Sequence, residues 1–381
     1  MSVELARLIA CHVFLHACMA GMRMAAPLLA LREGHSEASV GVLVALFALT
    51  QVFLALPAGR YADRHGLARP VGLGVIAASA GAALAVAWPV FPVLCLSALL
   101  TGGATGAASI ALQRHVGRAA EGATQLRQVF SWLAIGPAIS NFIGPFAAGL
   151  VIDHAGFRWA FFLLALLPLV AWLWARGARE HPAADASIAA PRSAWDLWQE
   201  PMFRRLLLTN WLLATCWDVH TFLVPVIGHE RGLSASVIGS ILGAFAIAAA
   251  AIRVLLPIVA ARVREWALVA AAMLASGVLL AIYPLLREAW AMGLCSVFLG
   301  VALGSVQPMI MSMLHQITPS HRHGEAVAMR MLVINASSVA MPVAFGAVGT
   351  AVGVTAVFWA VAAAVAVGAR LAFGLRGRQS S

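Results

Sequence analysis

Long runs of apolar residues, separated by short polar turns, fill almost the whole chain. From these runs we predict helices over residues 5–31, 38–58, 70–88, 91–112, 127–152, 157–175, 204–228, 236–260, 265–286, 290–314, 325–348 and 354–374. A helix of roughly 20 apolar residues crosses a hydrocarbon layer about 30 Å thick. Alternation of apolar and polar positions is absent, and the runs are too long for barrel strands. The pattern therefore predicts an all-α membrane protein with twelve transmembrane helices.

Composition supports this prediction and narrows the function. Hydrophobic residues make up 62% of the chain, charged residues only 10%, and the mean hydropathy is +0.91. A water-soluble domain does not have this composition. The chain has no phosphate-binding glycine loop, catalytic dyad or carboxylate pair, so we expect neither an enzyme nor a cofactor. The five cysteines fall inside predicted helices without metal-ligand spacing, and we expect free thiols.

The distribution of the basic residues along the chain indicates the membrane topology. All 25 are arginines, scattered between apolar runs and not gathered into one face, so the net charge of +10 does not indicate nucleic-acid binding. Eighteen fall in the tails and connections on one side, and four on the other: Arg32, Arg158, Arg231 and Arg287. By the positive-inside rule, both termini are predicted to be cytoplasmic. We predict a multi-pass protein of the bacterial cytoplasmic (inner) membrane that acts as a monomer.

An internal repeat divides the chain. An offset of 198 positions aligns Pro27 with Pro225, Gly34 with Gly232, Ser36 with Ser234, Gly41 with Gly239 and Phe47 with Phe245. Similarity at half the chain length is typical of transporters built from two parallel six-helix repeats. We therefore predict two pseudo-symmetric bundles, residues 1–175 and 204–381, joined by a cytoplasmic linker over 176–203.

A charged segment follows the second apolar run. Its Gly59, Asp63, Arg64 and Gly66 resemble the signature loop of the major facilitator superfamily of secondary transporters. The resemblance implies the fold of that family, transport by alternating access, and a cytoplasmic latch formed by the Asp and Arg. Leu67 and Ala68 stand where basic residues usually follow in that family. Alternatively, the glycines form a tight turn and the charges only anchor topology.

The fifth predicted helix contains Gly144, Pro145 and Gly149, with Ser140 and Ala148 at positions that are glycine in the full pattern. This sequence is similar to the Gly-Pro motif of the family's proton-driven exporters, the twelve-helix drug and metabolite:proton antiporters. Small residues let helices approach closely, and a proline allows bending. Ordinary close packing is the alternative interpretation.

Ionisable residues inside membrane helices are candidate functional groups because burying a charge in lipid is costly. Asp218 is the only carboxylate predicted deep in a helix, and we interpret it as the proton-coupling group. A structural ion pair that never titrates is the alternative, and a pair between Arg23 and Asp218 is a hypothesis. His220, two residues further on, points away from Asp218 around the helix, and is either a cavity residue or a packing residue.

Further polar residues could line a substrate cavity. Arg23 and Arg253 would favour an anionic substrate if both face it, and Asn141, Gln307 and Asn335 could add neutral hydrogen bonds or only join helices. Arg330 and Glu325 are expected near the membrane interface. His12 and His16 are one turn apart, but without a third ligand we expect no metal site.

These observations favour a secondary transporter that exports a small organic molecule, with the proton gradient as its energy source. Proton-linked uptake or exchange of an organic anion is the alternative within the same fold. An alternative of another class is a membrane sensor or scaffold that does not transport. The substrate itself does not follow from these residues, because one fold serves many substrates.

Overall fold

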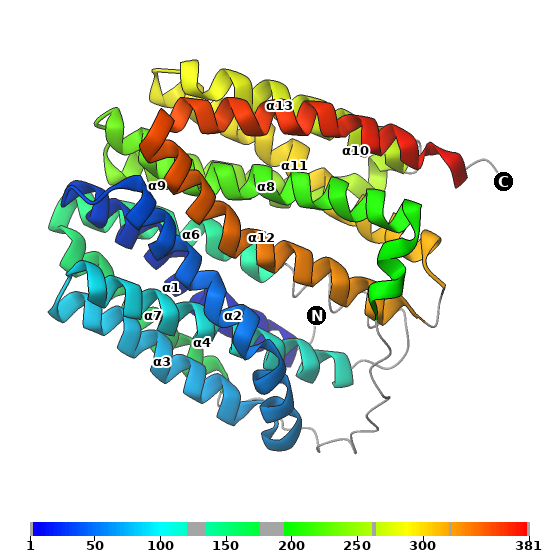
Figure 1. Ribbon diagram of the computed structural model, residues 1–381. Coiled ribbons are helices and arrows are strands. Elements are labelled where there is room, and N and C mark those ends of the chain that lie inside the picture. Colours follow the sequence, from blue (N-terminus) through cyan, green and yellow to red (C-terminus); the bar gives the residue numbers. More distant parts are fainter. Residues whose placement is uncertain (1–2, 120–134, 176–193, 261–263, 320–321, 379–381) are drawn as a thin grey trace. The chain divides into compact units, whose positions relative to one another are not determined.

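A computed structural model describes residues 3–119, 135–175, 194–260, 264–319 and 322–378 (Figure 1). The described α-helices are α1 (Val3–Arg32), α2 (Glu37–His65), α3 (Ala68–Ala87), α4 (Phe91–Ala119), α6 (Ile135–Ala155), α7 (Phe157–Ala175), α8 (Pro201–Glu230), α9 (Ala235–Ala260), α10 (Glu265–Ile282), α11 (Ala289–Ile317), α12 (His323–Val352) and α13 (Val354–Phe373). Short 3₁₀ helices are η1 (Ala194–Gln199), η2 (Tyr283–Leu285) and η4 (Gly374–Arg378). The described residues contain no strand.

Each predicted helix corresponds to one of these α-helices, so the all-α prediction is confirmed. Ten contain a stretch long and apolar enough to cross a membrane, and α7 contributes a shorter apolar stretch, Phe157–Leu173. The remaining helix, α6, includes the polar Ser140 and Asn141. The predicted start of that helix, residues 127–134, lies outside the described part of the chain.

Several helices continue past the apolar runs that predicted them. The end of α2 was predicted at residue 58, yet the helix extends to His65. Arg60, Tyr61 and Ala62 are compatible with a helix although they are not a membrane sequence. The predicted signature loop is therefore helical up to His65, and the chain reverses at Gly66, whose φ of 72° suits a residue without a Cβ.

Contacts divide the chain into two compact units. Unit 1 comprises the described residues of Met1–Ile188 and Gly228–Gly243, and unit 2 those of Ala189–Ile227 and Ala244–Ser381. The corner between α8 and α9 thus groups with the first half of the chain. The predicted bundle limits and linker stay a prediction, and residues 176–193 of that linker lie outside the described part.

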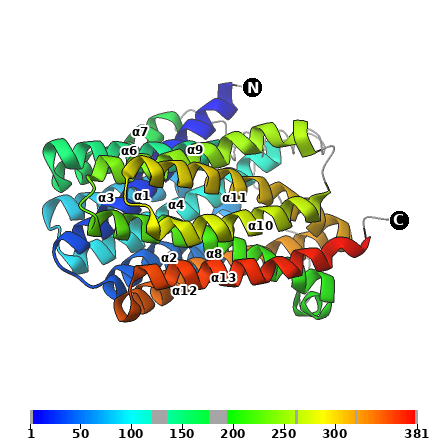
Figure 2. The ribbon, with the colours of Figure 1, turned by 90° about the horizontal axis from the view of Figure 1, so that it is seen from above.

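In unit 1 the helices form a bundle around α1. This helix packs against α4, α6 and α7, while α3 packs against α4 and α7, and α2 packs against α4 (Figures 1 and 2). Most of α1 is buried, and many of its residues are Ala, Met or Cys. Small side chains on a central helix let its neighbours approach closely.

Unit 2 is a second helical bundle. Here α10 packs against α11 and α13, and α12 against α13. Most residues of α8 in its membrane stretch are buried. The polar side chains described below contact one another from α8, α9, α11 and α12.

The predicted repeat is visible in how the helices touch. A Cβ on Gly102 of α4 would overlap the carbonyl oxygen of Phe47 in α2, and a Cβ on Gly106 would meet the side chain of Gln51. At the offset of 198, the equivalent contacts in unit 2 are Gly300 of α11 with Phe245 of α9, and Gly304 with Ala249. The same glycine pair, one turn apart, therefore joins the equivalent helices in both units.

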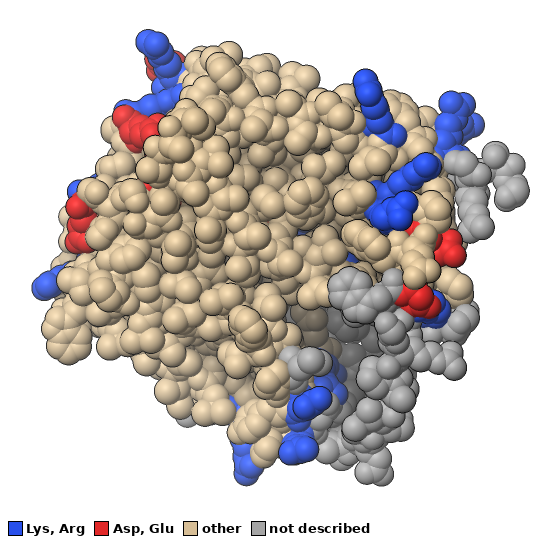
Figure 3. Space-filling model, in the orientation of Figure 1, with Lys and Arg blue, Asp and Glu red and all other residues tan. Residues whose placement is uncertain are grey.

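Exposed charged side chains lie towards the helix ends. On the face shown in Figure 3, Arg, Asp and Glu side chains gather near the ends, and a broad surface between them carries none. Exposed large apolar residues such as Phe53, Ile76 and Val278 cover the flanks of the helices. An uncharged apolar flank is what a lipid-facing surface requires.

Candidate functional site

Asp218 lies in the middle of α8, 17 residues from its first residue and 12 from its last. Its side chain is buried, with 4% exposed. The hydroxyls of Ser337 and Ser338 in α12 donate to its two carboxylate oxygens at 3.3 and 3.4 Å. A mid-helix carboxylate in contact with hydroxyls of a second helix has the position that a proton carrier needs. The role of Asp218 stays a prediction.

His220 faces a different group of helices, as the two-residue spacing predicts. It is completely buried, with 0% exposed, and its Nε2 lies 2.8 Å from the Ser296 hydroxyl of α11. That hydroxyl is also 3.0 Å from the Tyr283 hydroxyl, and the imidazole stacks on Phe245. In this structure His220 is therefore packed among buried side chains, and its role stays a prediction.

Two arginines lie inside unit 2. Arg253 of α9 is half-buried, its Nε donates to the Gly304 carbonyl at 3.4 Å, and its guanidinium carbon is 5.9 Å from the Trp217 ring. Arg330 of α12, which was predicted near the membrane interface, is buried within the protein with only 6% exposed, and its depth in the membrane stays a prediction. Its burial follows from its place two turns inside α12, where Asn210 and Gln307 accept its hydrogen bonds.

The predicted neutral residues take different places. Gln307 accepts a hydrogen bond from Arg330 and therefore joins α11 to α12. Asn335 of α12 and Asn141 of α6 are half-buried. Asn141 belongs to unit 1 and Asn335 to unit 2.

Arg23, the predicted ionisable residue of unit 1, is half-buried in α1. About three turns away on the same helix, His12 is within 3.0 Å of the Ser109 hydroxyl and edge-on to His16. Among the described residues, no group of three or more His, Cys, Asp or Glu side chains could hold a metal ion.

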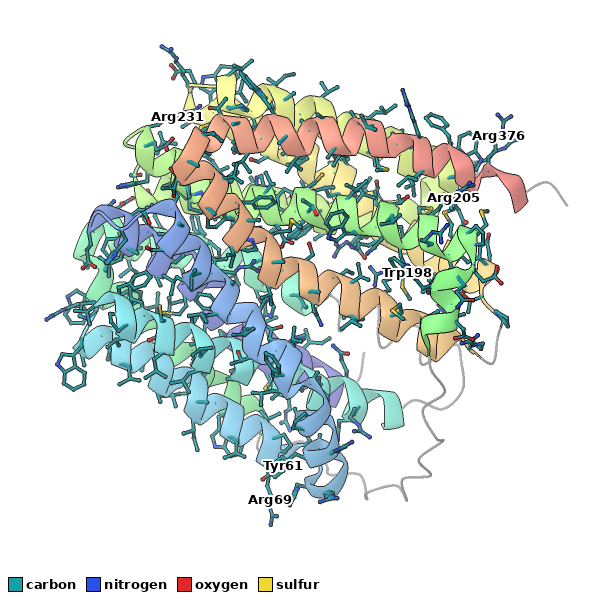
Figure 4. The ribbon with its side chains drawn as sticks, viewed as in Figure 1. Tyr61, Arg69, Trp198, Arg205, Arg231 and Arg376 are labelled. Atoms are coloured by element: carbon teal, nitrogen blue, oxygen red, sulfur yellow. The ribbon has the colours of Figure 1, made fainter. Side chains whose placement is uncertain are left out.

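The residues of the predicted latch lie at the end of α2. Nη1 of Arg114 in α4 donates to the Gly59 carbonyl at 2.5 Å, so an arginine outside the motif holds this end of α2. Arg64 is exposed, and the side chain of Asp63 lies outside the described part of the structure. Figure 4 shows Tyr61 and Arg69 beside this end, and Arg231 at the opposite end of unit 1.

The motif on α6 lies between two helices. A Cβ on Gly144 would overlap the backbone of Ala17 in α1. On the other side, a Cβ on Gly149 would overlap the carbonyl of Ala235 in α9, and a Cβ on Gly239 would overlap that of Pro145. The motif thus allows α6 to approach both α1 and α9 at backbone contact.

One end of unit 2 concentrates basic and aromatic residues. Arg205 donates to the Gly374 carbonyl at 3.3 Å, and Arg376 lies over the Trp266 ring at 5.5 Å. Figure 4 shows Trp198 at the same end. Arg322 forms an ion pair with Asp196 of η1 through two hydrogen bonds of 2.7 Å. This hydrogen bonding to Arg322 lowers the pKa of the Asp196 carboxyl below its usual value.

Residues 8–292 and 206–381 match the sequence profile of the Major Facilitator Superfamily. The chain belongs to this superfamily. It is therefore a multi-pass membrane protein and a secondary transporter, as the signature segment and the internal repeat predicted. No curated protein sequence matches the chain.

Solved structures of other superfamily transporters share the fold. A bacterial homolog of the human lysosomal transporter Spinster, in an inward-facing and occupied conformation, is 13% identical with a TM-score of 0.78, over 97% of this chain and 96% of that one. A POT family transporter in complex with a thioalcohol-conjugated peptide is 13% identical with a TM-score of 0.80, over 99% and 96%. The nucleoside transporter NupG is 14% identical with a TM-score of 0.75, over 97% and 98%.

For this superfamily member, the sequence did not single out Asn210, Trp217, Ser337 or Ser338. An Asn, a Trp and two Ser residues are common in membrane helices and carry no local signal. Only the packing of α8 against α9, α11 and α12 brings them to the ionisable groups. Arg330 did carry a signal, since it is an arginine inside a predicted helix.

Proposed function

We propose that this protein is a proton-coupled transporter that exports a small organic molecule across the bacterial cytoplasmic membrane by alternating access. Asp218 is the residue that carries this proposal. A carboxylate at mid-helix, buried beside hydroxyls of α12, can take up a proton in one conformation and release it in another when its surroundings change.

Export is the proposed direction because the α6 sequence resembles the motif of proton-driven exporters. In this structure Gly144 and Gly149 allow close contact with α1 and α9, which is also what a helix that shifts against its neighbours needs. The arginine distribution supports cytoplasmic termini, and the end of α2 then faces the cytoplasm, where Asp63 and Arg64 act as a latch.

Proteoliposomes with a pH-sensitive dye test the coupling. Each compound of a panel of drugs, organic acids and neutral metabolites is added with an imposed pH gradient, and proton movement and compound movement are recorded together. We expect movement of at least one compound against its gradient by the wild type. Asp218→Asn should abolish gradient-driven transport but retain exchange of the compound between the two sides.

The matched control is Asp196→Asn, which removes an exposed carboxylate of unit 2. It should retain gradient-driven transport. If Asp218→Asn also retained it, another group would carry the proton and the assignment would fail.

The second candidate function is proton-linked uptake or exchange of an organic anion. The two arginines inside unit 2, Arg253 and Arg330, favour it. Direction separates the two candidates. Accumulation of an anion with an inward proton gradient supports uptake, whereas expulsion with the same gradient supports export.

A further inference from the structure

Arg330 is a buried cation whose hydrogen-bond partners are all neutral. Its Nε donates to Oδ1 of Asn210 at 3.3 Å, and one terminal nitrogen donates to Oε1 of Gln307. The other terminal nitrogen is 3.9 Å from the sulfur of Met331, which is a weak acceptor. A guanidinium has five N–H donors, so this environment leaves donors of Arg330 without a strong acceptor.

Arg253 of α9 is half-buried, and its described partners are also neutral. It donates to the carbonyl of Gly304 and lies over the ring of Trp217. Within the described part of the chain, neither arginine forms an ion pair with a carboxylate. Buried charges in proteins are normally paired, and intramembrane arginines normally have a partner or a water-filled surrounding.

The two arginines converge on one stretch of α11. Their acceptors, Gly304 and Gln307, are three residues apart, which is about 4.5 Å along the helix axis and on the same side of the helix. Arg330 is seven residues from the start of α12, and Arg253 seven residues from the end of α9. Both helix ends lie at the end of unit 2 that carries Arg205 and Arg376, so both charges lie about 10 Å inside it.

Asn210, which contacts Arg330, carries a second group without a partner. It is 1% exposed, its Oδ1 accepts from Arg330, and its Nδ2 is buried without a hydrogen-bond partner. A buried amide donor without an acceptor is costly. Arg330, Arg253 and Asn210 therefore combine two cations with an amide donor that lacks an acceptor. What these side chains lack is a hydrogen-bond acceptor or a negative charge.

We propose that Arg330, Asn210 and Arg253 form an anion-binding site that takes the carboxylate or phosphate group of a small organic anion. The guanidinium of Arg330 binds the anionic group through its remaining donors, the Nδ2 of Asn210 adds a hydrogen bond, and Arg253 supplies the second charge. The Trp217 ring beside Arg253 offers a flat apolar surface for the organic part. That this anion is the transported molecule rests on the proposed function.

Thermal unfolding of the purified protein in detergent tests the site without any gradient. The probes are benzoate, phenyl phosphate and inorganic phosphate at millimolar concentrations, with benzamide as the neutral analogue of benzoate. We expect benzoate or phenyl phosphate to raise the midpoint temperature of unfolding, with saturation at high concentration, and benzamide to leave it unchanged. Arg330→Gln, which retains neutral hydrogen-bonding groups, should weaken the apparent affinity about tenfold or more.

Arg376→Gln is the matched control, because it removes an arginine from the same unit outside the site, and it should leave the affinity unchanged. If Arg330→Gln does not fold, Arg253→Gln at a half-buried position provides the same comparison. Equal stabilisation by benzamide and benzoate, unchanged affinity in both variants, or no stabilisation by either organic anion would overturn the proposal. If inorganic phosphate stabilised the protein as strongly as phenyl phosphate, the claim that the site recognises the organic part of the anion would be overturned.

This result is separable from the proposed function. If anion binding depends on Arg330 but no transport occurs in proteoliposomes, the anion site is supported and the transport function is contradicted. If the protein transports only neutral compounds and binds none of the anionic probes, the proposed transport function is supported and the proposed anion site is contradicted.

Discussion

Asp218 and His220 are two residues apart on α8 and have different surroundings. Asp218 is contacted by two hydroxyls of α12 at distances above 3.2 Å, which are long for O–H···O hydrogen bonds. His220 is within 2.8 Å of the Ser296 hydroxyl and has aromatic rings of Phe245 and Tyr283 around it. A carboxylate in contact with hydroxyls of another helix is suited to proton transfer, whereas the tightly packed imidazole is suited to fixing α8 against α9 and α11.

Ser296 is the residue that tests the packing role of His220. In Ser296→Ala the buried Nε2 of His220 loses the hydroxyl that it contacts at 2.8 Å, which costs about 1–3 kcal/mol. We expect a lower apparent melting temperature in detergent. Ser305→Ala is the matched control on α11, because among the described residues the Ser305 hydroxyl donates to the carbonyl of Ala302 in its own helix and to no other. Equal effects of the two variants would contradict the packing role.

How far each residue could be predicted from sequence depends on whether its signal is local. Asp218 was visible because a single carboxylate within an apolar run is unusual at any depth. The burial of Arg330 was not visible in the sequence, because it results from contacts with Asn210 and Gln307, which are 120 and 23 positions away in the chain. Contacts over such separations come from helix packing, which a periodic pattern does not specify.

At the scale of helices, pairs of glycines fix how closely α2 approaches α4 and α9 approaches α11. The sequence repeat aligned Phe47 with Phe245, and the structure shows that their partner glycines, Gly102 and Gly300, follow the same offset. Both glycines meet a backbone carbonyl, which cannot move aside as a flexible side chain can. The ends of helices were less predictable, as α2 shows. An apolar run indicates which residues face lipid, whereas the helix can continue into polar residues beyond it.

Gly102→Ala and Gly300→Ala should therefore damage both units in the same way. Each added methyl would overlap a carbonyl oxygen and force the helices apart, at about 1–3 kcal/mol. We expect a lower yield of monodisperse protein in fluorescence-detected size-exclusion chromatography. Gly59→Ala is the control, because its Cβ would lie 3.7 Å from Arg114, an ordinary contact. A normal elution profile for either repeat variant would contradict the equivalence.

The ion pair between Asp196 and Arg322 attaches η1 to the start of α12, and its pH dependence has a defined sign. Because the pKa of Asp196 is lowered in the folded protein, the pair contributes above the usual carboxyl pKa of about 3.9. The contribution is lost as the pH falls through the lower folded value. Asp196→Asn should release η1 at neutral pH.

Limited proteolysis between η1 and α8 measures this attachment. We expect faster cleavage in Asp196→Asn than in the wild type at pH 7, and a wild-type rate that approaches the variant's only in strong acid with an acid-stable protease. Glu200→Gln is a suitable control because Glu200 is a nearby exposed carboxylate. Identical cleavage of wild type and Asp196→Asn at pH 7 would show that the pair does not hold η1.

At the scale of the molecule, the corner between α8 and α9 belongs to unit 1 although most of both helices belongs to unit 2. Asp153, near the end of α6, accepts hydrogen bonds from the backbone N–H groups of Ala235 and Ser236 at 2.9 and 2.7 Å. It thus caps the N-terminus of α9, where the helix dipole also favours a negative charge. Below the cap, Gly149 and Gly239 bring the backbones of α6 and α9 into contact.

In the proposed alternating-access cycle the α8–α9 corner separates from α6 in one state, and the cap of Asp153 should then set how often it opens. Asp153→Ala removes both hydrogen bonds at a cost of about 1 kcal/mol, which corresponds to roughly fivefold more of the open form. Hydrogen–deuterium exchange of residues 232–240 should then accelerate by that factor, while peptides of α3 stay unchanged. Ser240→Ala, which removes an exposed hydroxyl from the first turns of α9, should leave the exchange as in the wild type. Because the cap acts only while the corner is closed, an unchanged exchange rate in Asp153→Ala would mean that the glycine contacts alone hold α9 against α6.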